Sequence, residues 1–236
     1  MRIAIHQPDY IPYLGYFYKM AHCDRFVFLD DCQFSNDNFH HWNKIKTPQG
    51  ECRLKVPVEQ HLGDAINAVR TKDELKWKEK HLKTFTMNYA KAPHYAEIFP
   101  VFEELLTRKY ASLADMNIAI NTWLCRSFGF GCELSRTSEM TIDTVREERV
   151  IDICKMLDGD SYLSGRGAAA YEKEEDFTAR GVQLIYTDYE PITYPQLWNK
   201  QCGFLPYMSV MDYVFNCGFD WKPVDEAVKE LHNGDR

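Results

Sequence analysis

Side chains able to move protons follow two short hydrophobic runs near the beginning of the chain. His6 comes directly after Ile3-Ala4-Ile5, and Asp30 and Asp31 come after Phe26-Val27-Phe28-Leu29. An imidazole titrates near neutral pH, and a carboxylate serves as a general base or as a ligand of a divalent metal. The sequence therefore predicts catalytic roles for His6 and for one of the two aspartates, and it leaves open which one. The alternatives are a histidine that caps a strand and aspartates in a solvated turn or a helix cap.

Residues that suit substrate binding surround the first of these positions. The Gln7 amide can orient a carbonyl or hydroxyl group. Tyr10, Tyr13 and Lys19 bring hydroxyl groups and an ammonium to the expected start of a helix, where Gly15 allows close approach of the backbone. A helix N-terminus favours an anion such as a nucleotide pyrophosphate, so we expect these residues to bind substrate. Packing is the alternative role of each tyrosine.

Basic and glycine-rich segments further along the chain suit phosphate groups. Asn43, Lys44 and Lys46 form a short polar and basic cluster. Ser164-Gly165-Arg166-Gly167 follows an expected strand, where backbone N–H groups and the Arg166 guanidinium can hold a phosphate. Because the protein is acidic overall, an anionic substrate needs such local positive charge. A solvated loop explains the lysines nearly as well.

The composition excludes several classes of protein. The 236 residues carry 28 basic and 35 acidic side chains, a net charge of −7, which opposes sequence-independent binding of nucleic acid. We find no signal-peptide core and no run of roughly 20 apolar residues that could span a membrane, so we expect a cytoplasmic protein. The eight cysteines lack the close-pair spacing of a zinc site, and we assign no metal ligands. Aromatic residues make up 14% of the chain, which argues against disorder.

The elements that position these residues alternate between strands and helices. A strand at 3–5, a helix at 16–22 and a strand at 25–29 have the length of a βαβ crossover, which implies a parallel sheet with ligands at the carboxyl ends of its strands. We therefore predict an α/β fold with a mostly parallel sheet built from the N- and C-terminal parts. We expect a single domain over 1–236, with a helical insertion or subdomain at 73–157. Further strands are expected at 53–58, 160–165 and 182–186, helices at 168–179, 208–216 and 224–231, and irregular segments at 32–52 and 188–206.

Long motifs in the chain resemble the WbqC-like protein family. The first runs from residue 6 to 19 and reads His-Gln-Pro-Asp-Tyr-Ile-Pro-Tyr-Leu-Gly-Tyr-Phe-Tyr-Lys. The resemblance continues to about residue 219, in Phe-Val-Phe-Leu-Asp-Asp-Cys-Gln-Phe at 26–34, Asn-Lys-Ile-Lys-Thr at 43–47, Tyr-Leu-Ser-Gly at 162–165, Met-Ser-Val-Met-Asp at 208–212 and Phe-Asn-Cys-Gly at 215–218. One departure is visible: the family usually has Asn-Arg-Asn-Arg where this chain has His-Trp-Asn-Lys at 41–44. An arginine contact to a phosphate at position 42 is therefore not carried over.

The resemblance implies a bacterial protein of surface-polysaccharide biosynthesis, such as O-antigen biosynthesis. It also implies transfer of a glycyl or related acyl group to an amino sugar, an inference by analogy with the family. By resemblance alone, four further residues join the substrate-binding set: Gln33, Tyr171, Gln196 and Asn216.

Together these features predict a transferase that moves a glycyl or related acyl group to the amine of a nucleotide-linked amino sugar. His6 or one aspartate would deprotonate the amine, and Lys44, Lys46 and Arg166 would hold phosphates. The donor stays open between an acyl-CoA, an aminoacyl carrier and an amino acid activated by ATP with Mg²⁺. One alternative is an ATP-dependent adenylate-forming ligase or nucleotidyltransferase-like enzyme. Another is a non-catalytic nucleotide-sugar-binding protein of the same pathway. The sequence leaves a homo-oligomer open.

Overall fold

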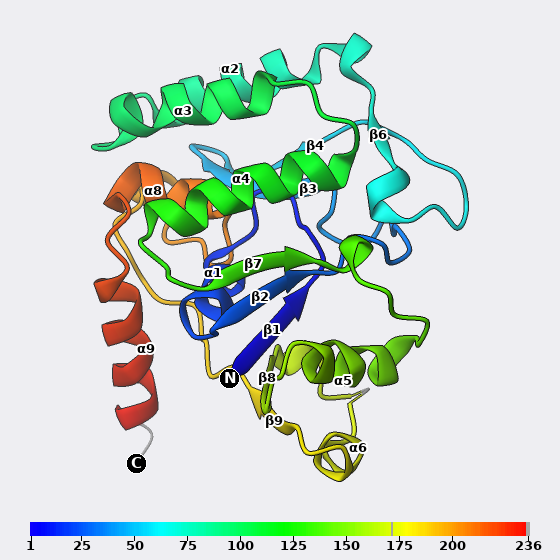
Figure 1. Ribbon diagram of the computed structural model, residues 1–236. Coiled ribbons are helices and arrows are strands. Elements are labelled where there is room, and N and C mark those ends of the chain that lie inside the picture. The colour runs from blue at the N-terminus through cyan, green and yellow to red at the C-terminus, as the bar shows by residue number, and fades with distance from the viewer. Residues whose placement is uncertain (171, 235–236) are drawn as a thin grey trace.

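A five-stranded parallel sheet forms the centre of the protein (Figure 1), as seen in a computed structural model that describes residues 1–170 and 172–234. The strand order is β7-β2-β1-β8-β9, and every neighbouring pair is parallel. The predicted α/β fold with a sheet built from both parts of the chain is therefore confirmed. The strands are β1 (Arg2–His6), β2 (Arg25–Phe28), β7 (Glu133–Arg136), β8 (Ser161–Ser164) and β9 (Gln183–Tyr186).

Both faces of the sheet are buried because the interior positions of its central strands, Ile3-Ala4-Ile5 in β1 and Phe26-Val27-Phe28 in β2, are apolar on both sides. In β1, Ala4 packs into the cluster on one face, whereas Ile3 and Ile5 pack into the cluster on the other. In β2, Phe26 and Val27 divide in the same way. This alternation is the two-residue period of a strand. Each face must then be covered by helices, as in other parallel sheets.

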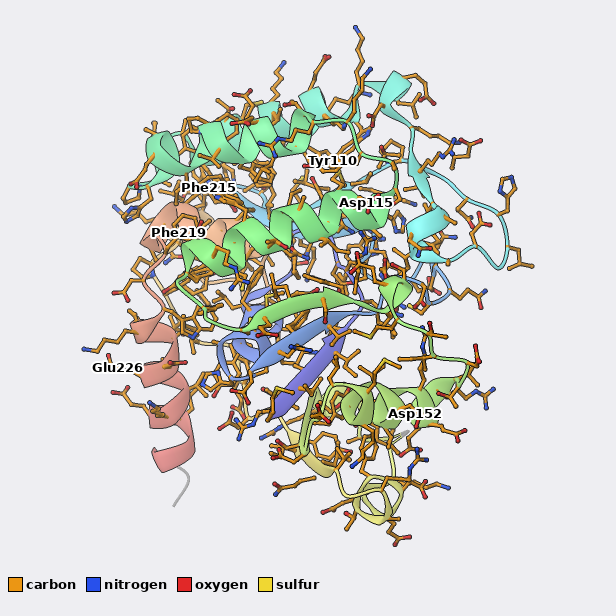
Figure 2. The ribbon with its side chains drawn as sticks, in the orientation of Figure 1. Tyr110, Asp115, Asp152, Phe215, Phe219 and Glu226 are labelled. Atoms are coloured by element: carbon orange, nitrogen blue, oxygen red, sulfur yellow. The ribbon has the colours of Figure 1, made fainter. Side chains whose placement is uncertain are left out.

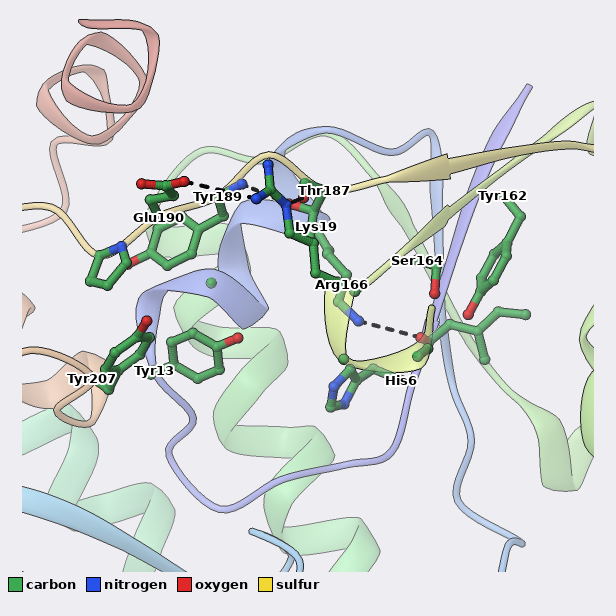
Figure 3. Close-up of a pocket in the computed structure, with 16 residues that line it drawn as sticks. His6, Tyr13, Lys19, Tyr162, Ser164, Arg166, Thr187, Tyr189, Glu190 and Tyr207 are labelled. Atoms are coloured by element: carbon green, nitrogen blue, oxygen red, sulfur yellow. Dashed lines mark hydrogen bonds and ion pairs between the residues drawn. The ribbon is translucent and has the colours of Figure 1, made fainter. Parts of the chain in front are cut away.

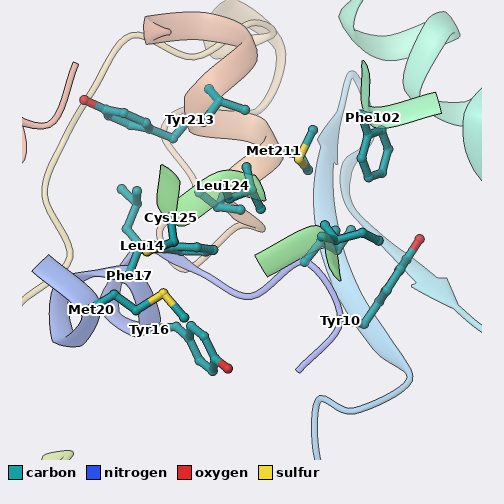
Figure 4. Close-up of a cluster of buried hydrophobic side chains, with 14 of the residues drawn as sticks. Tyr10, Leu14, Tyr16, Phe17, Met20, Phe102, Leu124, Cys125, Met211 and Tyr213 are labelled. Atoms are coloured by element: carbon teal, nitrogen blue, oxygen red, sulfur yellow. The ribbon is translucent and has the colours of Figure 1, made fainter. Parts of the chain in front are cut away.

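Different sets of helices cover the two faces of the sheet. The larger cluster gathers side chains from α1 (Leu14–Ala21), α4 (Leu113–Ser127) and α8 (Val210–Cys217) (Figure 4). The smaller cluster contains residues of α5 (Arg146–Met156) and α6 (Glu174–Ala179). Among the described residues no helix combines the length and the apolar character needed to cross a membrane.

A second layer packs beyond α4 (Figure 1). It contains the antiparallel hairpin of β3 (Trp42–Thr47) and β4 (Gly50–Lys55), and a short pair formed by β5 (Val58–Glu59) and β6 (Arg70–Thr71). The remaining helices are α2 (Trp77–Tyr89), α3 (Tyr95–Thr107), α7 (Asn199–Cys202) and α9 (Lys222–Gly234), with 3₁₀ turns η1 (Ile66–Ala68), η2 (Asp73–Leu75), η3 (Thr137–Glu139) and η4 (Arg166–Ala168).

Some predicted boundaries were wrong. The segment 32–52 contains most of a hairpin rather than irregular chain, and the strand expected at 53–58 divides between β4 and β5. Within 73–157 lie the helices α2, α3, α4 and α5 and also β7, an edge strand of the central sheet, and the helical insertion or subdomain over this segment stays a prediction. In β7 and in the hairpin, polar and apolar residues alternate only weakly along the sequence. These segments therefore become strands because they pair with other strands in the folded protein.

Candidate active site

A pocket of about 630 Å³ lies at the carboxyl ends of β1, β8 and β9 (Figure 3). The chain leaves β1 toward β2 on one side, while β8 lies on the other side of β1, so the strand order reverses at this place. Open α/β sheets bind ligands at such a switch point, and we call this cavity the switch-point pocket. The lining residues come from the first strand and helix and from 162–207: Ile5, His6, Tyr13, Gly15, Lys19, Tyr162, Ser164, Gly165, Arg166, Gly167, Ala168, Thr187, Tyr189, Glu190, Pro191 and Tyr207.

His6 is the last residue of β1 and lines the pocket. Its Nδ1 lies 3.1 Å from the carbonyl oxygen of Gln7. Because a carbonyl can only accept, Nδ1 carries the proton and Nε2 holds the lone pair. Burial against the Tyr16 ring, assisted by the nearby Lys19 ammonium, lowers the pKa of His6 from 6.5 to about 4. At neutral pH His6 is therefore an uncharged imidazole that can accept a proton at Nε2.

Asp9 lies between His6 and a second, fully buried histidine. Oδ2 of Asp9 is 3.7 Å from Nδ1 of His6, and Oδ1 is 3.2 Å from Nδ1 of His40. Neighbouring asparagines fix this loop, since the Asn121 amide donates to the Asp9 carbonyl and the Asn117 amide to the carbonyls of Pro8 and His40. Both asparagines are on α4, so the helix that covers the sheet also sets the position of the loop.

Two cationic side chains that are far apart in the sequence, Lys19 and Arg166, line the same pocket. Lys19 is 5% exposed, and its Nζ approaches the carbonyl of Ile5 at 3.5 Å. Burial lowers the pKa of Lys19 to about 8, although Asp9 opposes this shift. Arg166 follows β8; its Nε donates to the Thr187 carbonyl, and its Nη1 lies 3.8 Å from Oε1 of Glu190. An ammonium and a guanidinium together suit a phosphate or diphosphate.

Three tyrosines form an aromatic wall of the pocket. The ring of Tyr13 meets Tyr189 and Tyr207 edge-on, with centroids 6.0 and 5.9 Å apart. Gly15 lies directly below these rings, because a Cβ there would approach Tyr13 at 2.4 Å and Tyr189 at 2.8 Å. Aromatic faces of this kind pack against sugars and nucleobases, while their hydroxyl groups provide polar contacts.

The predicted acidic pair lies at the end of β2 and does not line the pocket. Asp30 is fully buried and accepts hydrogen bonds from Arg136, Ser138 and, more weakly, Thr137. Arg136 is also bound by Asp115 of α4 (Figure 2), while Asp31 pairs with Arg149 at 2.6 Å. Because arginines hold both carboxylates, we infer that the two aspartates have a structural role at the ends of β2 and β7 rather than a role in proton transfer.

A second group of predicted site residues forms a buried polar network away from the pocket. The Lys46 ammonium donates to Oε1 of Gln196 at 2.9 Å and to two groups in the segment after it, Asn199 and Gly203. Gln196 in turn donates to Asp212, which also accepts from Tyr89 and Tyr194. Asn216 accepts from the backbone N–H of Leu197. These contacts hold the irregular segment 188–206 against α8 and β3, so a phosphate contact by Lys46 is not favoured.

The other predicted residues are dispersed. Gln7 donates to Sγ of Cys32, the Asn43 amide donates to the carbonyls of Tyr10 and Ile11, and Lys44 pairs with Glu51 at 2.9 Å. The Tyr10 hydroxyl is hydrogen-bonded to Nδ1 of His81 in the second layer, and Gln33 is exposed beside Ala65. Ser164 lines the pocket, but its hydroxyl donates to Glu172 at 2.9 Å. Tyr171 lies outside the described residues.

The pocket therefore unites part of the predicted set and adds residues that the sequence analysis missed. His6, Tyr13, Gly15, Lys19, Ser164, Gly165 and Arg166 were predicted and line it. Tyr189, Glu190 and Tyr207 were missed because they lie in or after a proline-punctuated segment without periodicity. Asp9 stood inside the first motif, where a carboxylate three residues after His6 was a usable signal.

Comparison with known proteins agrees with the motifs quoted above. Residues 7–222 match the model of the WbqC-like protein family. An uncharacterized protein of Mycobacterium tuberculosis, Rv1507c, is 30% identical over 224 residues, which are 92% of this chain and 94% of that protein. No solved structure matches the chain at a significant level. The family match spans every strand of the central sheet except β1 and every described residue of the pocket except Ile5 and His6. On this match and the relative together we conclude that the chain belongs to the WbqC-like protein family.

Proposed function

We propose that this protein is a transferase that moves a glycyl or related acyl group to the amine of a nucleotide-linked amino sugar in surface-polysaccharide biosynthesis. The observation that carries the proposal is a single pocket that combines a neutral histidine, His6, with the cations Lys19 and Arg166. The histidine suits removal of the amine proton, and the cations suit the diphosphate of the nucleotide sugar. The glycyl group and the polysaccharide setting rest on the family resemblance.

The proposed reaction forms a bond between the amine nitrogen and the acyl carbonyl carbon, and it breaks the bond between that carbon and the leaving atom of the donor. Nε2 of His6 takes the amine proton as the new bond forms. The proton then passes to the departing thiolate or oxygen, so that the imidazole returns to its neutral state. Tyr13, Tyr189 and Tyr207 would hold the sugar or base while Lys19 and Arg166 hold the diphosphate. His6 thus takes the role of base that the sequence divided between it and the aspartates.

The test is a thermal-shift screen of uridine diphosphate amino sugars, acyl-CoAs and ATP with Mg²⁺, followed by mass spectrometry of mixtures of the ligands that bind. We expect a nucleotide amino sugar to raise Tm and to gain the mass of an acyl group. In His6→Asn the thermal shift should persist while the product falls by about a hundredfold or more, the usual effect of losing a general base.

Other outcomes would reject the proposal in distinct ways. Release of AMP and pyrophosphate from ATP and an amino acid would assign an adenylate-forming enzyme. A thermal shift with no product from any donor would assign a non-catalytic nucleotide-sugar-binding protein. If His6→Asn lost the thermal shift along with the product, His6 would be a binding residue rather than the base.

A further inference from the structure

A second hollow, of about 500 Å³, lies between the end of β4, β5 and the start of α2. In Figure 1, β4 and α2 lie in the upper part of the view, well apart from β8 and β9 in its lower part. Its walls share no residue with the switch-point pocket. They are formed by Asn36, Lys55, Pro57, Val58, Gln60, Lys72, Leu75, Trp77, Lys80 and His81.

The charge of this hollow is opposite to that of the whole chain. Lys55, Lys72 and Lys80 line it, and no aspartate or glutamate is among the described residues that line it. The nearby carboxylate of Asp73 borders the hollow but is already paired, because it accepts from Thr71, from the ring nitrogen of Trp77 and from Lys78, whose ammonium balances its charge. In a protein with a net charge of −7, a concave surface with three ammonium groups and no lining carboxylate concentrates anions.

An apolar wall accompanies the lysines. Leu75 is 49% exposed, and Val58 and Trp77 lie beside it in the lining. A hollow of this size holds a small molecule, since ligand pockets span roughly 300–1,000 Å³. The ligand that fits these features carries an anionic group for the lysines and an apolar or ring-shaped part for Leu75 and Val58.

We propose that this second hollow binds a small phosphorylated molecule, whose phosphate or diphosphate is held by Lys55, Lys72 and Lys80. The proposal does not rest on the transferase assignment. One wall residue of the hollow, His81, also contacts the first motif. Its Nδ1 is hydrogen-bonded at 2.9 Å to the hydroxyl of Tyr10, which lies in the loop that joins His6 to α1.

Inorganic pyrophosphate without metal is the probe, and ¹⁹F NMR of protein labelled with 5-fluorotryptophan is the measurement. The chain has five tryptophans, and Trp77→Phe identifies the Trp77 resonance. We expect pyrophosphate to shift this resonance saturably. The triple variant Lys55→Gln/Lys72→Gln/Lys80→Gln should weaken that response by about tenfold or more, as expected for loss of charge-assisted contacts. The single variant Lys72→Gln should weaken it less, and urea unfolding checks that each variant is folded.

Two controls separate this site from general charge effects and from the switch-point pocket. Lys83→Gln/Lys91→Gln/Lys109→Gln removes the same charge from exposed lysines outside both pockets and should leave the Trp77 response unchanged. Arg166→Gln should also leave it unchanged. The proposal is overturned if millimolar pyrophosphate does not move the Trp77 resonance, if the control triple weakens the response as much, or if Arg166→Gln abolishes it.

Discussion

Nδ1 of His6 lies 3.7 Å from Oδ2 of Asp9, whose other carboxylate oxygen lies 3.2 Å from Nδ1 of His40. One carboxylate therefore faces two imidazoles, of which one lines the pocket and the other is fully buried behind it. Asp9 raises the pKa of His6, but burial and the Lys19 ammonium lower it more. The charge state of His6 is thus set first by burial, while Lys19 and Asp9 act on its pKa in opposite directions.

We predict that the two neighbours of His6 shift its titration in opposite directions. In the wild type the imidazole should titrate at about 4 and be almost entirely neutral at pH 7. Lys19→Met removes a positive charge and should raise the pKa of His6, whereas Asp9→Asn removes a negative charge and should lower it. NMR titration of the His6 ring measures both effects without a substrate, with the exposed His61 ring as a reference in each variant. Shifts of the same sign in both variants would contradict this account.

The affinity for a nucleotide sugar should decrease as the pH rises from 7 to 9. The pKa of Lys19 is lowered to about 8, so its ammonium loses its proton in this range and the anion loses a contact. We expect a decrease of about tenfold, the usual effect of one charge-assisted hydrogen bond. Lys19→Met should bind weakly at pH 7 and show no such decrease. Calorimetric titrations of both proteins at several pH values measure this, and a flat wild-type profile would reject a contact between Lys19 and the anion.

Gly15→Ala should impair ligand binding although alanine favours a helix more than glycine does. The new Cβ would lie 2.4 Å from the Tyr13 ring and 2.8 Å from Tyr189, so both rings must move into the pocket. Because ring displacement requires little energy, we expect a change in Tm of only a few degrees, of either sign, and an affinity weakened by about tenfold. Gly131→Ala is the matched control, since Gly131 is not among the pocket's lining residues and a Cβ there meets no described atom within 4 Å. Equal affinities of the two variants would show that the aromatic wall does not contact the ligand.

Asp30→Asn should lower stability more than activity. The change leaves the Arg136 guanidinium with Asp115 as its remaining acidic partner, and loss of one member of a buried pair destabilises by about 3–5 kcal/mol. Urea unfolding measures this, and turnover per folded molecule should change by less than about threefold, well below the effect of losing a general base. A stable but inactive variant would restore the catalytic role that the sequence predicts for Asp30.

The same variant should show a defined pH dependence. Burial alone would raise the pKa of Asp30, but hydrogen bonds from Ser138 and Arg136 outweigh burial and hold the pKa below its usual value of 3.8. The ionised carboxylate therefore stabilises the fold at pH values above 3.8, and this stabilisation is lost as the pH falls through the lower pKa of the folded state. The difference in unfolding free energy between the wild type and Asp30→Asn should therefore become smaller as the pH falls below 3.8, because the wild type loses this stabilisation.

The parallel sheet was predictable because its determinants are local. Ile3-Ala4-Ile5 and Phe26-Val27-Phe28 are apolar throughout, as strands covered on both faces must be, and the segment between them has the length of a crossover helix. For the same reason His6, Tyr13, Gly15 and Lys19 could be assigned to one site from a single stretch of sequence.

The roles of other residues depend on partners that are distant in sequence. Asp30 and Asp31 look like free acids until Arg136 and Arg149 are seen to hold them. Lys46 looks like a surface cation, yet it is fully buried and donates to Gln196, 150 residues further on. No periodicity or motif predicts such pairs, because they follow from the path of the whole chain.

The composition of the pocket also has a consequence for biosynthesis of the protein itself. Five of its described lining residues, from Ile5 to Lys19, are synthesised well before the other eleven, from Tyr162 to Tyr207, emerge from the ribosome. Until then β1 lacks its neighbour β8, and the apolar faces of Ile3 and Ile5 are without the helices that later cover them. We therefore expect a chain that ends before β8 to expose apolar surface and to be prone to aggregation, and fragments truncated there should bind no ligand at this pocket.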